Sequence, residues 1–457
     1  MRTYFMLKRV ELWIVLITLL IFTIGAVIFG GLVRHELLAS ESKFPKLTKA
    51  ALFIAEIPSN ANRMVNGINS DMRVEDRFPN VSGFEGKPNN YESYLLLSRY
   101  SGEKNESIVE LIDLTSFNKI HEWNPDIDKS NSIIEAGREE FQYLARDKNN
   151  SRYSISHPLL FDDGSIIFHG GSTALTRVDQ CSNLIWQNDE DRFHHSIEVD
   201  YEGDIYVPIH IYPYEVDQKY VGDSVENFLD DGIAKISKQG KMLYKKSIAN
   251  IFLENDLGHL LFGTGDDEFN RDPIHLNDIQ PLLKDTLYGK KGDLFLSMRH
   301  QSMIILYRPS SNKIIWRSTG KFLRQHDVDI LDDRTISIFN NDSPFGFSGA
   351  FVDGHNEVLI YDFNDSKTSK YLDGSLSSHD LKTVSGGRSQ IIDNGDLFVE
   401  ETNFGRSVYF DADGSLRWQH VNRAEDGVYS VNWSRIIYED RDVSKVKGFL
   451  ENRKNCN

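Results

Sequence analysis

Four short segments of the chain carry imidazoles and one guanidinium at positions from which they could meet in a common pocket. The residues of interest are His195, His275, Arg299 and His326, with Asn277 two positions after His275. A neutral imidazole is a competent nucleophile near neutral pH, because its reference pKa is about 6.5. An arginine beside it supplies positive charge for an anionic group. The segments are FHHSIEVD (193–200), DPIHLNDI (272–279), LSMRHQS (296–302) and RQHDVDIL (324–331).

Two of these segments contain neighbouring candidates. Successive side chains of a strand point to opposite faces, so only one of His194 and His195 can face a pocket, and the sequence does not decide which. The same rule predicts Arg299 on the more polar side of its strand and His300, on the opposite face, as a structural residue.

The other candidates also have ordinary structural interpretations. His326 could be a hydrogen-bonded loop histidine, and the His275–Asn277 tripeptide could simply form a turn. Six further histidines follow no such pattern, and we expect them to be ordinary: His169, His210, His259, His355, His379 and His420.

The elements that must position these residues are repeated β units. A turn rich in Asp, Asn or Gly opens an apolar strand, a second strand follows, and a third ends in Trp or Tyr. The end markers are spaced by 47 to 72 residues. Repeats of several strands each are typical of a propeller, in which polar residues on different blades face one channel. The copies span 92–123, 160–187, 198–245, 289–317, 330–372 and 389–419, and their end markers are Trp123, Trp186, Tyr244, Trp316, Tyr371 and Trp418.

We therefore predict an all-β fold, a six-bladed β-propeller, preceded by an N-terminal transmembrane helix. The alternative architecture is a pair of β-sandwich domains.

Residues 272–341 resemble the bacterial arylsulfotransferase family. His-Leu-Asn precedes a strand, Ser-Met-Arg-His-Gln ends one, and Lys-Ile-Ile-Trp-Arg, Gln-His-Asp and Phe-Asn-Asn follow in order. The His-His pair before the turn at 200–203 and residues 394–418 fit as well. The resemblance implies transfer of a sulfuryl group from a phenolic sulfate ester to a phenol through a sulfated histidine, without a nucleotide donor.

The resemblance also implies a role for each candidate. His326 of Gln-His-Asp would be the nucleophile. His275, Asn277 and Arg299 would bind the sulfuryl oxygens, and His195 would contribute a further donor. Such a transfer spreads negative charge over peripheral oxygens, which preorganised positive donors stabilise.

Other function classes have little support in the sequence. We find no phosphate loop, zincin motif or nucleophile elbow, and we expect neither a cofactor nor a metal. The partners expected are a small aryl sulfate donor and a phenolic acceptor. One alternative is a non-catalytic, membrane-anchored propeller that scaffolds an envelope complex or binds glycans, because the fold alone does not decide function. Another is the same pocket acting on a carbohydrate or lipid sulfate.

Charge argues against nucleic acid as a partner. The chain has 68 acidic and 51 basic residues, a formal net charge of −17, and no concentrated basic run.

Its two cysteines, Cys181 and Cys456, could form one bridge outside the cytoplasm or remain two thiols, since Cys456 lies in an expected loose tail.

One segment is apolar enough to cross a membrane. Residues 12–33 contain no charge, and their length suffices for a hydrocarbon core of about 30 Å. Arg2, Lys8 and Arg9 precede this segment and favour a cytoplasmic N-terminus. The predicted order is a cytoplasmic segment 1–11, an uncleaved signal anchor 12–33, a stalk and irregular lead-in 34–90, an extracytoplasmic catalytic propeller 91–440 and a C-terminal tail 441–457.

Overall fold

The computed structural model describes residues 11–38, 44–65, 72–263, 268–454 and 456. The chain divides into two units, Met1–Ser70 and Asp71–Asn457. Almost all of the predicted cytoplasmic segment lies outside the described residues.

The first unit contains two helices, α1 (Leu12–Leu38) and α2 (Pro45–Val65). Within α1, Leu12–His35 is long and apolar enough to cross a membrane, a property that an N-terminal signal sequence shares. Helix α2 occupies much of the predicted stalk.

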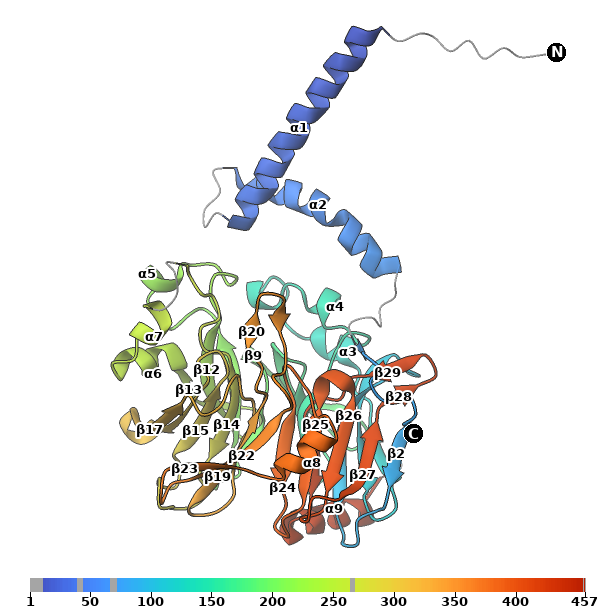
Figure 1. Cartoon of the computed structure of the whole chain (residues 1–457), viewed down its shortest axis with the longest axis vertical. Coiled ribbons are helices and arrows are strands. Elements are labelled where there is room, and N and C mark those ends of the chain that lie inside the picture. Colours follow the sequence, from blue (N-terminus) through green and yellow to red (C-terminus); the bar gives the residue numbers. More distant parts are fainter. Residues whose placement is uncertain (1–10, 39–43, 66–71, 264–267, 455, 457) are drawn as a thin grey trace, which may run out of the picture. The chain divides into compact units, whose positions relative to one another are not determined.

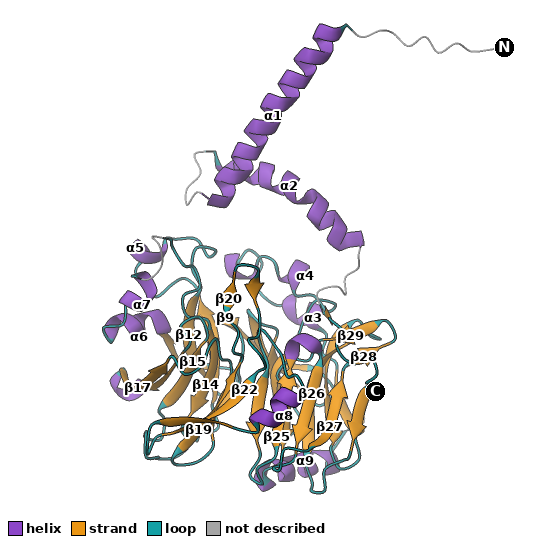
Figure 2. Cartoon of the chain, in the orientation of Figure 1, coloured by secondary structure: helices purple, strands orange, loops and turns teal. Residues whose placement is uncertain are grey.

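The second unit is built mainly of antiparallel strands (Figure 2). They form successive sheets in chain order, and each predicted repeat copy falls within one run of strands. The first sheet is β3 (Tyr94–Ser101), β4 (Glu106–Asp113) and β5 (Asn118–Trp123), with the late strand β30 (Arg435–Ile437) beside β3. The second sheet begins with β6 (Ser156–Leu160), β7 (Ile166–His169), β8 (Thr173–Val178) and β9 (Leu184–Phe193). Strand β9 also pairs with β11, so this sheet continues into β10 (Glu198–Val199), β11 (Ile205–Ile211), β12 (Asp230–Ile236) and β13 (Met242–Ser247).

Three further sheets follow along the chain. One is β14 (Leu276–Pro281), β15 (Leu294–Met298), β16 (Met303–Arg308) and β17 (Lys313–Thr319). Another is β18 (Val328–Ile330), β19 (Thr335–Asn340), β22 (Glu357–Asp362) and β23 (Lys367–Lys370). The third is β24 (Arg388–Ile391), β25 (Leu397–Glu401), β26 (Arg406–Phe410) and β27 (Leu416–Val421), with β2 (Gly83–Gly86) beside β27.

Small elements complete the unit. Short strands pair as β1 (Arg73–Val74) with β29 (Gly427–Tyr429) and β28 (Arg423–Ala424), and as β20 (Phe345–Gly346) with β21 (Gly349–Ala350). The α-helices are α3 (Ile127–Asn131), α4 (Leu144–Asp147), α5 (Gln218–Val221), α6 (Ile248–Glu254), α7 (His259–Phe262), α8 (Asp373–Ser378) and α9 (Asp440–Glu451). The 3₁₀ helices are η2 (Glu139–Phe141), η3 (Pro309–Ser311) and η4 (Thr402–Phe404). Strands β1 and β2, within the predicted lead-in, thus belong to the β unit.

The hydrophobic core lies between the sheets. Every residue of β15 and of β25 is buried, because these strands are covered on both faces. Most core clusters join strands that follow one another, such as β15 and β16 with β18, β19 and β22. One cluster joins the last sheet to the first, where Leu95 and Leu97 of β3 pack with Tyr409 and Trp418. Burial of one such side chain contributes roughly 1.5–3 kcal/mol.

The C-terminal segment is tied to the β unit. Most of the predicted tail is helix α9, whose Val443, Val446 and Phe449 are buried against the first two sheets. Figure 1 shows α9 at one end of the sheets and β20, α3 and α5 at the other.

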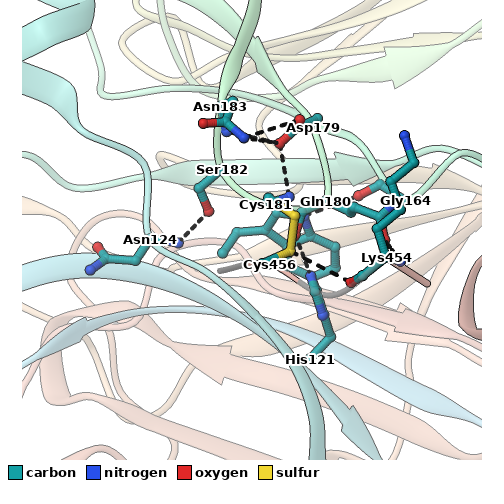
Figure 3. The surroundings of a disulfide bond; sticks show 11 residues. His121, Asn124, Gly164, Asp179, Gln180, Cys181, Ser182, Asn183, Lys454 and Cys456 are labelled. Carbon is teal, nitrogen blue, oxygen red and sulfur yellow. Dashed lines mark hydrogen bonds between the residues drawn. A yellow bond between two sulfur atoms is a disulfide. The ribbon is translucent and has the colours of Figure 1, made fainter.

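A disulfide joins Cys456 to Cys181 in the turn between β8 and β9 (Figure 3). The backbone N–H of Lys454 also donates to Oε1 of Gln180 at 2.7 Å. The two cysteines, for which the sequence left both states open, are therefore paired, and Lys454 and Cys456 are held at this turn rather than loose.

Candidate active site

His326 lies two residues before the start of β18, and its ring is held in a defined tautomer. Its Nδ1 lies 2.6 Å from Oδ1 of Asn341. The Asn341 amide donates to the carbonyls of Thr383 (3.0 Å) and Gly386 (2.9 Å), so its Oδ1 is the acceptor. Nδ1 of His326 therefore carries the hydrogen and Nε2 carries the lone pair.

The lone pair on Nε2 of His326 faces a glycine turn. The backbone N–H of Gly386 donates to it at 2.8 Å. Gly386 and Gly387 have φ values of +66° and +78°, which glycine adopts without strain. The turn is thus shaped to direct an amide hydrogen at the nitrogen that would act as nucleophile.

The surroundings keep the imidazole of His326 neutral. Its side chain is almost completely buried, and burial lowers the pKa of His326 well below its usual value. The positive charge of Arg299 lowers this pKa further. A neutral imidazole keeps its lone pair for attack.

Arg299 and His300 differ from the prediction for this strand. Strand β15 ends at Met298, so both residues lie in the turn that follows it and the alternation of faces does not apply to them. Nδ1 of His300 donates to the carbonyl of Asp272 at 2.7 Å, and Nη1 of Arg299 donates to Nε2 of His300 at 3.0 Å. The prediction of opposite faces is therefore wrong, and His300 orients the guanidinium.

The guanidinium of Arg299 retains unused hydrogen-bonding capacity. Its Nε is buried, and no group in the described part of the chain accepts its hydrogen. Burial, followed by the charge of Arg324, lowers the pKa of Arg299 to about 10, so the group remains cationic near neutral pH. A buried donor of this kind is costly unless a ligand accepts its hydrogen.

His275 is held by two carboxylates. Its Nδ1 lies 2.7 Å from Oδ2 of Asp272, and its backbone N–H donates to Oδ2 of Asp231 at 2.9 Å. The His275 ring centroid is 4.5 Å from that of His300. The residue has a φ of +55°, a left-handed conformation that these contacts maintain.

His195, rather than His194, faces the other candidates. The His195 ring centroid lies 5.2 Å from that of His275 and 6.3 Å from that of His326. The ring of His194 instead stacks on that of His210, with a centroid distance of 4.0 Å. His195 has a φ of +60°, and its Nδ1 stays within 2.7 Å of Nδ1 of His194.

Asn277 supports the backbone before the nucleophile candidate. It is fully buried, and its Nδ2 donates to the carbonyl of Gln325 at 3.0 Å. Its Oδ1 is buried without a hydrogen-bond partner.

Sequence reasoning did not single out several residues that complete the site. Trp433 lies beside β30, with its ring 6.2 Å from His195 and 6.4 Å from His326. The guanidinium of Arg324 lies over the ring of Phe345, and its Nε is buried without a partner. Nothing in the sequence marks Trp433, whereas Arg324 directly precedes the Gln-His-Asp motif that pointed to His326.

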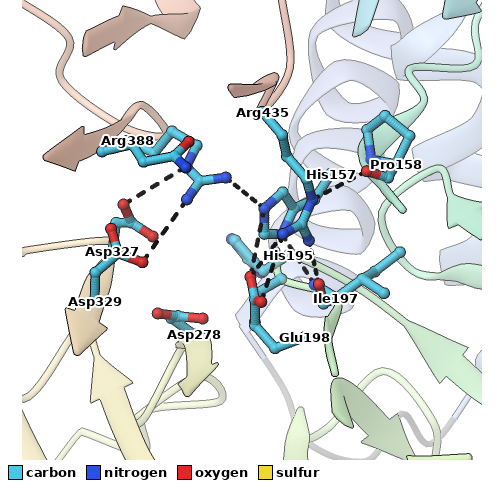
Figure 4. A network of polar contacts seen from close by, with 12 residues as sticks. His157, Pro158, His195, Ile197, Glu198, Asp278, Asp327, Asp329, Arg388 and Arg435 are labelled. Atoms are coloured by element: carbon cyan, nitrogen blue, oxygen red, sulfur yellow. Dashed lines mark hydrogen bonds and ion pairs between the residues drawn. The ribbon is translucent and has the colours of Figure 1, made fainter. Parts of the chain in front are cut away.

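A buried charge network lies next to this site (Figure 4). Asp327, the neighbour of His326, lies 3.6 Å from Nε of Arg388, and Asp329 lies 3.9 Å from its Nη2. Burial would lower the pKa of Arg388, but these two carboxylates raise it. Arg435 pairs with Glu198 at 3.2 Å. The network links the starts of several sheets and holds the strand that follows His326.

A cavity of about 290 Å³ opens on this network from the side of α9. Its walls include Glu198, Asp329, Arg388 and Arg435, but not the imidazoles described above. We place the candidate site at the imidazoles because the buried Nε atoms of Arg299 and Arg324 beside them find no acceptor among the described residues, and because burial lowers the pKa of His326.

No curated protein matches the chain. Among solved structures, a protein of unknown function from Bacteroides caccae is 11% identical with a TM-score of 0.45, over 76% of this chain and 100% of that chain. A streptogramin B lyase is 10% identical with a TM-score of 0.33, over 62% and 93%. A virginiamycin B lyase from Staphylococcus aureus is 8% identical with a TM-score of 0.34, over 59% and 85%. These scores are too low to assign a fold or a function.

The sequence profile described as Arylsulfotransferase (ASST) matches residues 157–423, more than half of the chain. This range contains His195, His275, Arg299 and His326, and the match confirms the resemblance seen in their motifs. The chain belongs to the arylsulfotransferase family.

Proposed function

We propose that this arylsulfotransferase-family chain moves a sulfuryl group from a phenolic sulfate ester to a phenolic acceptor through a sulfated His326. The transfer needs no nucleotide-bound sulfate donor such as PAPS. The observation that carries the proposal is the convergence of His326, His275, His195 and Arg299, which come from three different sheets. A scaffold or glycan-binding propeller has no need for such a convergence.

In the first half-reaction, Nε2 of His326 attacks the sulfur of the donor ester. The N–S bond forms as the S–O bond to the phenol breaks, and the phenoxide takes a proton from His275, whose Nδ1 lies against the carboxylate of Asp272. The hydrogen on Nδ1 stays on the ring, where Oδ1 of Asn341 stabilises the positive charge of the sulfo-imidazolium. The N–H of Gly386 must leave the Nε2 lone pair before attack, and we expect it then to donate to a sulfuryl oxygen.

Positive donors bind the sulfuryl oxygens as negative charge builds on them. Arg299 provides its unpaired Nε–H, and His275 and His195 face the same space. We assign Asn277 an indirect part, through the carbonyl of Gln325 that it holds. Removal of one such donor from an active site typically costs roughly 10²–10³ in rate.

In the second half-reaction, an acceptor phenol returns its proton to the histidine and attacks the same sulfur. The N–S bond breaks, and His326 regains its lone pair. Both half-reactions pass through one pocket, so donor and acceptor bind in turn.

We also propose that the sheets close into a six-bladed propeller. The pairing of β30 with β3 and the core cluster between the last and first sheets support closure of the ring. Such a ring would bring the start of each sheet to a central channel, beside which His326 lies.

The β unit is proposed to be extracytoplasmic and tethered by α1 as a single-pass anchor. The Cys181–Cys456 disulfide supports this location, because disulfides persist in oxidising compartments.

The test is acceptor-dependent release of phenol from a chromogenic aryl sulfate by the full chain in detergent. We expect release that a phenol acceptor stimulates, that His326→Ala abolishes, and that His259→Ala, at an exposed position of α7, retains. Release that persists in a folded His326→Ala variant would refute the proposed intermediate.

A further inference from the structure

A second cluster of potential ligands lies behind His195. The Nε2 atoms of His194 and His210 lie 3.2 Å and 3.5 Å from Oδ1 of Asp231. The three atoms all lie within 4.8 Å of one another. The sheet sets this geometry, since His210 of β11 pairs directly with Asp231 of β12, and His194 follows β9 on the other side of β11.

Two of these ligand atoms are buried and have no hydrogen-bond partner among the residues that the structure describes. They are Nε2 of His194 and Oδ1 of Asp231, and both side chains are at least nine-tenths buried. Among the residues that the structure describes, no lysine or arginine forms an ion pair with Asp231. A buried carboxylate without a cation is strongly unfavourable.

The spacing of the ligand atoms fits a tetrahedral metal ion. Zinc binds histidine nitrogen and carboxylate oxygen at about 2.0–2.2 Å, which places neighbouring ligand atoms about 3.3–3.5 Å apart. The two distances to Oδ1 of Asp231 lie close to this value.

The ligand side chains also make contacts through their other nitrogen or oxygen atom, as metal ligands do in established sites. Nδ1 of His210 lies 3.1 Å from Oγ of Ser172. Oδ2 of Asp231 accepts the N–H of His275, and Nδ1 of His194 lies 2.7 Å from Nδ1 of His195.

We propose that His194, His210 and Asp231 bind a divalent transition-metal ion, with zinc the best match to two imidazoles and one carboxylate. Water or another small ligand completes the fourth position. From its sequence His210 is expected to be ordinary and no metal is expected, and the three ligands have none of the short spacings that define metal motifs.

The consequence for catalysis, which rests on the proposed function, concerns the tautomer of His195. With a metal on Nε2 of His194, the hydrogen of that ring is on Nδ1 and donates to Nδ1 of His195. His195 then carries its hydrogen on Nε2, the ring nitrogen not engaged with His194, and can donate it to a sulfuryl oxygen.

Without a metal, the direction of the hydrogen bond between His194 and His195 reverses. His194 would place its hydrogen on Nε2, toward Asp231, and accept from Nδ1–H of His195. Nε2 of His195 would then present a lone pair, which repels an anionic substrate. The metal site therefore positions His195 and, through Asp231, the backbone of His275.

The test uses the full chain, stripped of metal with a chelator and titrated with Zn²⁺ in competition with a chromophoric chelator. We expect one ion per chain, and an increase in Tm when zinc is added. Asp231→Asn and His210→Gln should each lose this binding and this increase. His300→Gln is the matched control, because His300 belongs to a separate cluster with Asp272 and His275; it should bind zinc as the unaltered chain does.

Three results would overturn the proposal. They are a folded, stripped chain that binds no zinc, zinc binding that survives both His210→Gln and Asp231→Asn, and binding that is lost in His300→Gln. The readout needs no aryl sulfate. A chain that binds zinc at this site but transfers no sulfuryl group would therefore refute the proposed function and leave the metal site intact.

Discussion

Oδ1 of Asn341 lies 2.6 Å from Nδ1 of His326, and two backbone carbonyls hold the Asn341 amide in that orientation. This relationship fixes which nitrogen of His326 can act as the nucleophile. It also keeps a hydrogen-bond acceptor beside the ring, where positive charge would develop during transfer.

Asn341→Ala is expected to lower kcat by about 10²- to 10⁴-fold, because the ring loses both its preferred tautomer and its acceptor. Steady-state kinetics with a chromogenic aryl sulfate measure the effect. Asn364→Ala, in an exposed turn, is the control and should keep full activity. Equal activity of the two variants would contradict the assigned role of Asn341.

The charge of Arg299 should affect how kcat/KM for the donor depends on pH. Burial and Arg299 lower the pKa of His326, so the unprotonated nucleophile persists as pH falls through about 6.5, the usual histidine value. We therefore expect no acidic limb from His326 at that pH in kcat/KM for the donor.

Arg299→Gln should lower kcat/KM by roughly 10²–10³. It should also move any acidic limb to higher pH, because the loss of a positive charge raises the pKa of His326. Arg324→Gln is the control and should leave the acidic limb where it is, because the charge of Arg324 acts mainly on the pKa of Arg299. An unchanged limb in Arg299→Gln would show that the guanidinium does not act on the nucleophile.

Gly386→Ala is expected to impair both folding stability and activity. The left-handed backbone costs an alanine about 1 kcal/mol, and its Cβ would lie 3.2 Å from the Thr402 side chain. The accompanying shift moves the N–H that faces Nε2 of His326. Gly320→Ala has a similar φ of +78° with no atom nearby, so it should cost comparable stability without loss of activity. Chemical denaturation and kinetics together distinguish the two effects.

The disulfide is expected to stabilise the β unit by about 2–4 kcal/mol, because it closes a long loop in the unfolded chain. Reductant should lower the free energy of unfolding of the unaltered chain by that amount. The Cys181→Ser/Cys456→Ser double variant should already be destabilised and should not respond to reductant. A response in the double variant would indicate a different target of reduction.

Much of this arrangement could be predicted from sequence, because strand alternation and turn residues are local. Each repeat copy coincides with one run of paired strands, and the family motifs identify His326, His275 and Arg299, which lie in one region of the structure. The prediction for Arg299 and His300 was wrong because it required knowing that β15 ends at Met298.

No pattern in the sequence predicted the contacts between residues that lie far apart along the chain. Trp433 reaches the site only because β30 pairs with β3. The cluster of His194, His210 and Asp231 depends on the register of β9, β11 and β12, which single-sequence patterns do not specify. The same holds for the pairing of Cys181 with Cys456, which lie 275 residues apart.

The central claim is that His326 carries the sulfuryl group between donor and acceptor. The most direct measurement is peptide mass analysis of the full chain after brief exposure to an aryl sulfate without acceptor. We predict one added sulfuryl group on the peptide containing His326, which disappears when a phenol acceptor is supplied and never forms in His326→Ala. A sulfuryl group on another residue, or acceptor-dependent transfer with no modified peptide at any time, would contradict it.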